Sequence, residues 1–198
     1  MKKNAFLIVF LSALFSVYSA TAQVQANFGA KAGANFSTLV GTDGGTASAL
    51  VGPHFGGIAQ FSWPRGEGGV IKFAIQPELF YSMQGAKSGN DKTSLSYLNF
   101  ATVVQRFIGY SGFYIETGPQ IGFLMLGKNK TAGVTTDIKS QLKPIDISLI
   151  GGLGYMFKNG LGINTRFAMG ITSIQKDYDI HNTTIGVGLF YILGRQAE

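Results

Sequence analysis

Three observations predict an all-β fold in which eight antiparallel strands form an up-and-down transmembrane β-barrel. The chain opens with an export signal, apolar and polar residues alternate in eight later stretches, and the connections between these stretches alternate in length. No later segment reaches the ~18 uninterrupted apolar residues that a spanning helix needs. A closed barrel divides its apolar surface among short strands and leaves no unpaired backbone in lipid, so it suits an exported chain of this kind.

The N-terminus has the features of a secretory signal peptide. Lysines at positions 2 and 3 precede an apolar run over residues 5–17 that only two serines interrupt. The small residues Ala20-Thr21-Ala22 follow, as a signal peptidase requires. We therefore expect cleavage after Ala22, with Gln23 as the first mature residue.

Composition predicts one domain after the signal peptide, so that residues 1–22 are removed and residues 23–198 form the barrel. The chain contains no cysteine, which excludes disulfides and thiol chemistry. Charged residues make up 13% of the chain, about half the usual share. Part of the net charge of +6 leaves with the signal peptide, and the rest is dispersed. Nucleic-acid binding needs a clustered basic face, so this class of partner is excluded.

A period of two in hydrophobicity marks each strand, because successive side chains of a strand point to opposite faces. The first four stretches are 28–37 (Phe28 and Phe36 outward, Lys31 inward), 51–63 (Phe55 and Phe61 outward, His54 and Gln60 inward), 70–83 (Ile71, Phe73 and Leu79 outward, Lys72 and Glu78 inward) and 95–107. The last four are 112–126 (Phe113 and Ile121 outward, Glu116 inward), 144–157 (Ile147 and Leu153 outward, Asp146 inward), 161–173 (Ile163 and Phe167 outward, Arg166 inward) and 183–193 (Ile185 and Leu189 outward, Thr184 inward).

Two irregularities interrupt this pattern. The fourth stretch is apolar on both sides at Val103 and Val104, which suggests a β-bulge there. Pro77 and Pro119 fall in the middle of stretches, where a proline removes a ladder hydrogen bond. We interpret these prolines as markers of further bulges.

The lengths of the connections predict the orientation of the barrel. Short turns at 64–69, 109–111 and 158–160 alternate with longer loops at 38–50, 85–92, 128–143 and 174–182. Bacterial outer-membrane barrels have short periplasmic turns and long external loops, so the long loops are expected outside the cell. Aromatic residues at the periplasmic strand ends fit an interfacial girdle, and these are Phe28, Trp63, Phe113, Phe157 and Tyr191.

A soluble β-sandwich or lipocalin-like barrel is the alternative, with the apolar face inside and the polar face in water. That polar face is rich in glycine and nearly uncharged, which makes a poor solvated surface. The pattern therefore favours the membrane protein, located in the outer membrane of a Gram-negative cell envelope.

Several segments of the mature chain resemble the PorT-like outer-membrane β-barrel family of Bacteroidetes. These segments are GAKAGANFS (29–37), IQPELFYSMQGA (75–86), SYLNFATVVQRF (96–107), GFYIETGPQIGFLM (112–125), GGLGYMF (151–157) and TRFAMGITSI (165–174). The chain departs from the family at Asn99 and Ala101, where members often carry an acidic residue and a proline. The resemblance implies an outer-membrane barrel, and its name-giving branch implies an accessory role in protein secretion. It carries over no catalytic residue.

The candidate site is a set of charged side chains on the inward face. These are Lys31, Lys72, Glu78, Glu116, Asp146 and Arg166. An eight-stranded barrel is just wide enough for its own side chains, so opposite charges at matched depth should meet and pair. Counted from the periplasmic turns, Arg166 and Glu116 lie at similar depth and are expected to pair, with Lys31 and Glu78 completing a balanced cluster. We interpret the set as a structural plug of salt bridges, and a path for a solute or proton as the alternative.

Catalysis and metal binding are not expected. His54 and His181 are the only histidines, and neither has the spacing of a metal site or an evident nucleophile and acid beside it. The glycines of 151–154 are not followed by a helix, so they form no nucleotide loop. No cofactor is expected.

The sequence thus predicts a non-enzymatic outer-membrane barrel that stabilises the envelope or docks a partner through its external loops. Its expected partners are outer-membrane lipids and, through those loops, envelope or secretion proteins. A narrow, porin-like channel for small solutes and an accessory factor of secretion are the alternatives.

Overall fold

A computed structural model describes residues 24–41, 48–64, 71–109, 111–175 and 178–194. The predicted signal peptide and its cleavage site at Ala22 and Gln23 lie outside the described residues. The first predicted turn (64–69) and the first long loop (38–50) are described only in part. No helix within the described ranges is long and apolar enough to cross a membrane.

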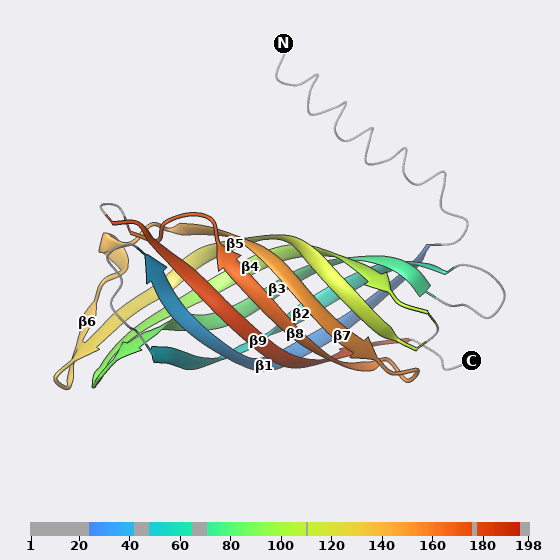
Figure 1. The fold of residues 1–198 in the computed structure, drawn as a ribbon, viewed down its shortest axis with the longest axis horizontal. Coiled ribbons are helices and arrows are strands. Elements are labelled where there is room, and N and C mark those ends of the chain that lie inside the picture. Colours follow the sequence, from blue (N-terminus) through green and yellow to red (C-terminus); the bar gives the residue numbers. More distant parts are fainter. Residues whose placement is uncertain (1–23, 42–47, 65–70, 110, 176–177, 195–198) are drawn as a thin grey trace, which may run out of the picture.

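Eight of the described strands form a closed antiparallel ring, which confirms the predicted fold class (Figure 1). The strands are β1 (Gln25–Gly41), β2 (Ser48–Pro64), β3 (Ile71–Ser88), β4 (Asp91–Phe107), β5 (Phe113–Thr131), β6 (Val134–Asp137), β7 (Ile145–Met156), β8 (Leu161–Gly170) and β9 (Ile180–Ile192). Around the ring they follow the order β4-β3-β2-β1-β9-β8-β7-β5, and β4 pairs with β5 to close it. The short β6 stands outside the ring and pairs with β5.

The two ends of the barrel differ. One end carries the short connections between β4 and β5 and between β7 and β8, together with the start of β1 and the end of β9; we call it the turn end. The opposite end carries longer connections, including β6 and the 3-10 turn η2 (Lys139–Gln141), and we call it the loop end (Figure 1). Of the predicted long loops, the described segment 128–143 contains the longer connection, whereas the connection expected at 85–92 is a two-residue turn between extended strands.

Side chains alternate between the outward face and the lumen along each strand, as predicted. Phe28 and Leu153 are 65% and 46% exposed on the outward face. Glu78 and Glu116 are only 2% and 4% exposed in the lumen. The outward face is thus an apolar band, and the polar side chains are inside. This arrangement is the reverse of a soluble β-barrel.

The alternation fails at the start of β3, where the prediction for Lys72 is wrong. The register between β2 and β3 shifts between Trp63 and Pro64. This bulge reverses the faces of the residues before Phe73, so that Ile71 is buried and Lys72 is exposed. The two residues exchange the positions that strict alternation assigned to them.

A bulge is present near the fourth predicted stretch, but the extra residue belongs to the neighbouring strand. β4 keeps one register with β3 along its whole length, and Val103 points inward while Val104 points outward. The irregularity lies between Ser96 and Tyr97 of β4, opposite Met125 of β5. β5 therefore turns both Met125 and Leu126 outward.

Pro77 and Pro119 do not mark bulges. The register of β2 with β3 is the same on both sides of Pro77, and that of β4 with β5 is the same on both sides of Pro119. Pro77 stays paired with Thr102 of β4, while its pairing with β2 is interrupted. Pro119 stays paired with Leu149 of β7, while its pairing with β4 is interrupted. A proline can stay in a strand in this way because it lacks only the donor for one ladder.

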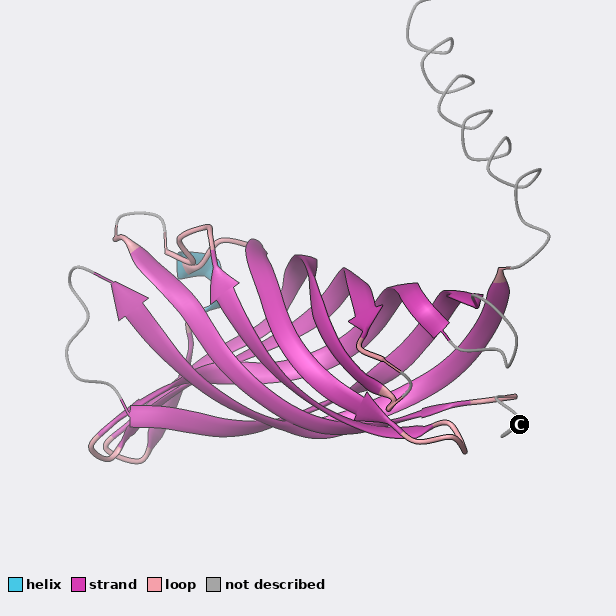
Figure 2. Ribbon diagram, turned by 45° about the vertical axis from the view of Figure 1, so that its right-hand side comes forward, coloured by secondary structure: helices cyan, strands magenta, loops and turns pink. Residues whose placement is uncertain are grey.

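The connection expected at 85–92 is an extension of the sheet. β3 continues to Ser88 and β4 begins at Asp91, so only Gly89 and Asn90 remain in the turn. β5 and β6 form a second hairpin beside it, and both hairpins project beyond the barrel wall (Figure 2). The loop end is therefore built partly from paired strands.

Two clusters of apolar side chains lie in the lumen, one nearer each end. The cluster nearer the turn end consists of Ile58, Ile71, Ala74, Phe107, Tyr114, Met156, Phe190 and Ile192. The cluster nearer the loop end consists of Leu95, Tyr97, Leu124, Leu142 and Ile174. β5 passes Tyr114, Glu116 and Leu124 in that order, so the polar part of the lumen lies between the two clusters.

A charged cluster in the barrel lumen

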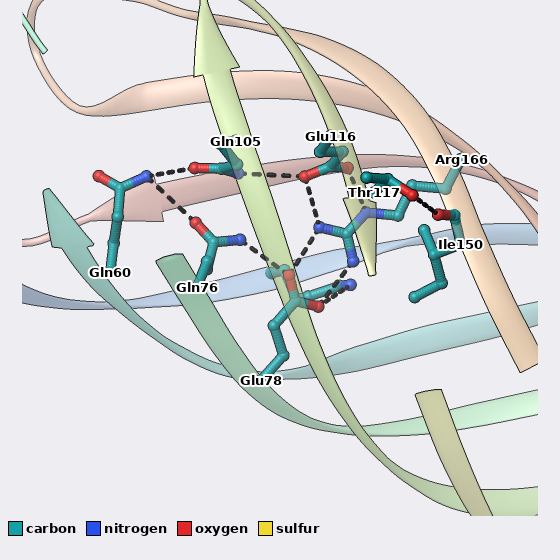
Figure 3. A network of polar contacts seen from close by, with 9 residues as sticks. Gln60, Gln76, Glu78, Gln105, Glu116, Thr117, Ile150 and Arg166 are labelled. Carbon is teal, nitrogen blue, oxygen red and sulfur yellow. Dashed lines mark hydrogen bonds and ion pairs between the residues drawn. The ribbon is translucent and has the colours of Figure 1, made fainter. Parts of the chain in front are cut away.

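Arg166 of β8 lies between two buried glutamates from distant strands (Figure 3). Its Nη1 and Nη2 donate to the two carboxylate oxygens of Glu78 on β3, each at 2.6 Å. Its Nε donates to Glu116 Oε1 on β5 at 2.5 Å, and Nη2 also reaches Glu116 Oε2 at 3.1 Å. The planar guanidinium can serve two carboxylates at once because its donors form a rigid fork.

Lys31 of β1 balances the charge of the cluster. Its Nζ donates to Glu78 Oε2 at 2.8 Å and lies 4.1 Å from the centre of the Phe80 ring. Two cations therefore face two carboxylates. All four side chains are at least nine-tenths buried. We call Lys31, Glu78, Glu116 and Arg166 the charge cluster.

Glycines on the intervening strands let these side chains reach one another. Gly152 of β7 lies directly between Glu116 and Arg166 in the register of the sheet. A Cβ there would stand 3.0 Å from Glu116 Oε1 and 3.1 Å from Arg166 Cγ, so a side chain would occupy the space of the ion pair. Gly56 of β2 has the same place between Lys31 and Phe80.

Glutamine side chains extend the charge cluster toward the turn end. Gln76 Nε2 donates to Glu78 Oε1 at 2.8 Å, and Gln105 Nε2 donates to Glu116 Oε2 at 3.1 Å. Gln60 Nε2 donates to the carbonyl oxygens of both of these amides. Each carboxylate therefore accepts an amide hydrogen bond besides its ion pairs (Figure 3). Such bonds lower the cost of burying charge.

A second polar group lies on the loop side of the charge cluster and involves His54. The Nδ1 of His54 is 2.8 Å from Asn35 Oδ1, and Asn35 Nδ2 donates to Ser82 Oγ at 2.8 Å. Gln84 also donates to Ser82, and Asn182 donates to Gln84. The imidazole is thus held by an amide, and no carboxylate among the described residues orients it as in a catalytic triad.

Two of the six predicted lumen charges take no part in the charge cluster, although Asp146 does face inward as predicted. Lys72 is on the outward face for the reason given above. Asp146 is buried at the start of β7, where its Oδ1 accepts a hydrogen bond from Thr172 at 3.1 Å. His181 contacts Asp179 at the loop end and takes no part in the hydrogen bonds around His54. Alternation alone does not mark the three glutamines as partners of the charge cluster, because amides are common on any polar face.

The lumen contains little free space around these residues. A cavity of about 40 Å³ lies beside the charge cluster, with Lys31, His54, Phe80, Gln120 and Arg166 among its lining residues. This is room for only a few water molecules. Among the described residues, no group of three or more His, Asp or Glu side chains could hold a metal ion.

Solved structures of two surface proteins resemble this fold. Neisserial surface protein A aligns with a TM-score of 0.56 at 10% identity, over 84% of this chain and 98% of its own. The attachment invasion locus protein Ail of Yersinia pestis aligns with a TM-score of 0.51 at 13% identity, over 85% and 99%. Ail has also been solved in complex with the heparin analogue sucrose octasulfate. At these identities the likeness concerns the fold alone.

The comparison with protein families covers most of the chain. The model of the outer membrane protein beta-barrel domain matches residues 21–176. Among curated proteins, no sequence match was found. The family match, the closed ring of strands and the apolar outward band agree with one another and locate the protein in the bacterial outer membrane. The chain belongs to the family of outer membrane protein beta-barrel domains.

Proposed function

We propose that this protein is a non-enzymatic barrel with a closed lumen, which docks a partner through the hairpins at its loop end. The charge cluster is the observation that supports the closed lumen. It is electrically balanced and hydrogen-bonded, and it lies between two clusters of buried apolar side chains.

Passage of a solute would require large rearrangements. A solute would have to part the Arg166 guanidinium from two carboxylates and then pass the packed rings of Tyr114 and Phe190, whose centres are 6.3 Å apart. Separating a buried ion pair leaves uncompensated charge in a medium of low dielectric. The cost of this separation favours the plug over the porin-like channel.

We propose that the protein is not an enzyme because the hydrogen-bond partners of its two histidines do not form a catalytic arrangement. His54 contacts Asn35, and His181 contacts Asp179, while neither contacts a serine hydroxyl within the described chain. A hydrolytic site would place a nucleophile, a base and an acid together.

The loop end has the form of a docking surface. The hairpins β3–β4 and β5–β6 project beyond the barrel wall as paired strands, and Val134 at the tip of β6 is 67% exposed. We propose that this end faces the outside of the cell. On the sequence segments quoted above, we assign the chain to the PorT-like outer-membrane β-barrel family.

Planar-bilayer recording tests the closed lumen. Wild-type protein is expected to show no discrete, stable conductance steps, and Arg166→Ala, which removes the centre of the charge cluster, is expected to show flickering currents. Stable openings in the wild type would replace the plug with the narrow channel. Docking is tested separately by cross-linking on intact cells, where removing residues 129–136 should abolish a partner adduct that the wild type forms.

A further inference from the structure

We propose that a row of three lysines at the loop end binds the phosphate groups of lipids in the outer leaflet. The row crosses three strands: Lys87 of β3 lies directly opposite Lys92 of β4, and Lys92 lies directly opposite Lys130 of β5. Residues directly opposite each other in antiparallel strands have their side chains on one face. We call Lys87, Lys92 and Lys130 the lysine row.

The lysine row is on the outward face of the sheet, where β3, β4 and β5 continue past the barrel wall. Lys92 is six residues from Leu98, an even number, so the two side chains lie on the same, outward face of β4. Lys130 is four residues from Leu126 and for the same reason lies on the outward face of β5. Lys128 lies between Leu126 and Lys130 on the same face. The side chains therefore extend sideways from the wall, toward the surrounding lipid.

The height of the lysine row matches the lipid headgroups. The outward apolar residues of β5 extend from Phe113 to Leu126. At ~3.4 Å per residue and a tilt of ~40°, this stretch covers ~34 Å, which spans the ~25 Å apolar band of an outer-membrane barrel and reaches into the interface. Lys130 lies four residues beyond Leu126, which is ~10 Å further from the membrane centre at the same rise and tilt, so the lysine row lies above the hydrocarbon region.

Within the described chain, the lysine row lacks its own counter-charge. None of its members forms an ion pair with a described residue. The acidic residue on this face is Asp137, which lies opposite Lys128 and accepts the backbone N–H of Lys139. Like charges directly opposite each other destabilise a sheet, so a bound anion would stabilise the arrangement.

Phosphate on a lipid suits this position better than a soluble anion. A lysine at the edge of an apolar band can bury its methylene stem against lipid while its ammonium stays at headgroup level. Anionic headgroups attract such basic residues over short distances. The proposal rests on the external placement of the loop end and is independent of the closed lumen.

The test uses the mature barrel in detergent micelles and counts bound lipid by native mass spectrometry. The probe is diphosphorylated lipid A, and its dephosphorylated form is the lipid control. The test variant combines Lys87→Gln, Lys92→Gln and Lys130→Gln. The matched control combines Lys72→Gln, Arg106→Gln and Lys158→Gln, which removes three exposed positive charges near the turn end.

We expect the wild type and the matched control to bind the phosphorylated lipid with equal affinity. The test variant should bind it at least about tenfold more weakly. Arginine at the same three positions should retain binding, which separates loss of charge from loss of folding. Equal binding by the test variant, equal loss in both triple variants, or equal binding of the dephosphorylated lipid would overturn the proposal. The proposal is also wrong if the three glutamine substitutions weaken the binding of heparin oligosaccharides but leave the binding of lipid A unchanged. That result would identify a soluble polyanion as the ligand.

Discussion

Arg166 and Glu116 meet across a strand that contributes only a hydrogen atom at their level. The two residues belong to β8 and β5, and the strand between them, β7, has Gly152 at the same register. Their side chains approach to 2.5 Å over that glycine. An ion pair between strands that are not neighbours requires this gap, because an eight-stranded barrel otherwise fills its interior with side chains.

The first prediction concerns the stability of the charge cluster. Arg166→Ala leaves Glu78 and Glu116 buried without their shared cation, at a cost of about 3–5 kcal/mol if water stays excluded. The unfolding temperature of the detergent-solubilised barrel should fall. Adding Glu116→Ala should cost less than the sum of the single changes, because the two side chains share one interaction. Arg106→Ala, at an exposed position, is the control, and additive effects would contradict the coupling.

The second prediction concerns the glycine between the ion-paired strands. A Cβ at Gly152 would stand 2.8 Å from the carbonyl oxygen of Thr165 and close to both charged side chains. Gly152→Ala should therefore lower the unfolding temperature, although alanine is otherwise a better strand residue than glycine. A Cβ at the neighbouring Gly151 would point outward and meet no atom within 4 Å, so Gly151→Ala should be neutral or stabilising. Equal effects of the two changes would show that the crowding at Gly152 is unimportant.

The third prediction concerns the lipid-facing surface. Leu153→Arg introduces a charge on the outward face, where arginine costs about 2–4 kcal/mol at the membrane midplane. Leu161→Arg introduces the same charge at the turn end, where the cost falls to about 0–1 kcal/mol. Urea titration of folding into lipid vesicles measures both. If the two variants are equally stable, Leu153 is not at greater depth than Leu161.

The fourth prediction concerns orientation. An epitope tag at Gly133, in the turn between β5 and β6, should be reached by antibody on intact cells. A tag at Asn159, in the turn between β7 and β8, should be reached only after the outer membrane is permeabilised. The reason is the placement of the longer connections outside the cell. The reverse labelling would place the loop end in the periplasm.

The fifth prediction concerns processing. The small residues before Gln23 form a signal-peptidase site, so the protein in the outer-membrane fraction should begin at Gln23. Intact mass measurement decides this directly. A chain in that fraction that still carries Met1 would contradict the signal peptide.

The strands of this protein, and the faces of most of their residues, could be predicted from the amino-acid sequence. Alternation is a local property, because each side chain of a strand points opposite to the one before it. For this reason Glu116 and Arg166 could be assigned to the lumen, and Leu153 to the lipid face, without knowledge of their neighbours. Glycine-rich inward positions such as Gly152 also agreed with a crowded interior.

Depth counted along the strands predicted the members of the charge cluster, but the individual contacts were decided by the tertiary structure, because they depend on the register between strands that are far apart in sequence. That register places Arg166 between Glu78 and Glu116 while it leaves Asp146 with Thr172. It also places the bulge that turns Lys72 outward, a change that alternation within β3 alone could not reveal. The lysine row has the same origin: Lys87, Lys92 and Lys130 are dispersed along the chain, and cross-strand pairing beyond the barrel wall makes them neighbours.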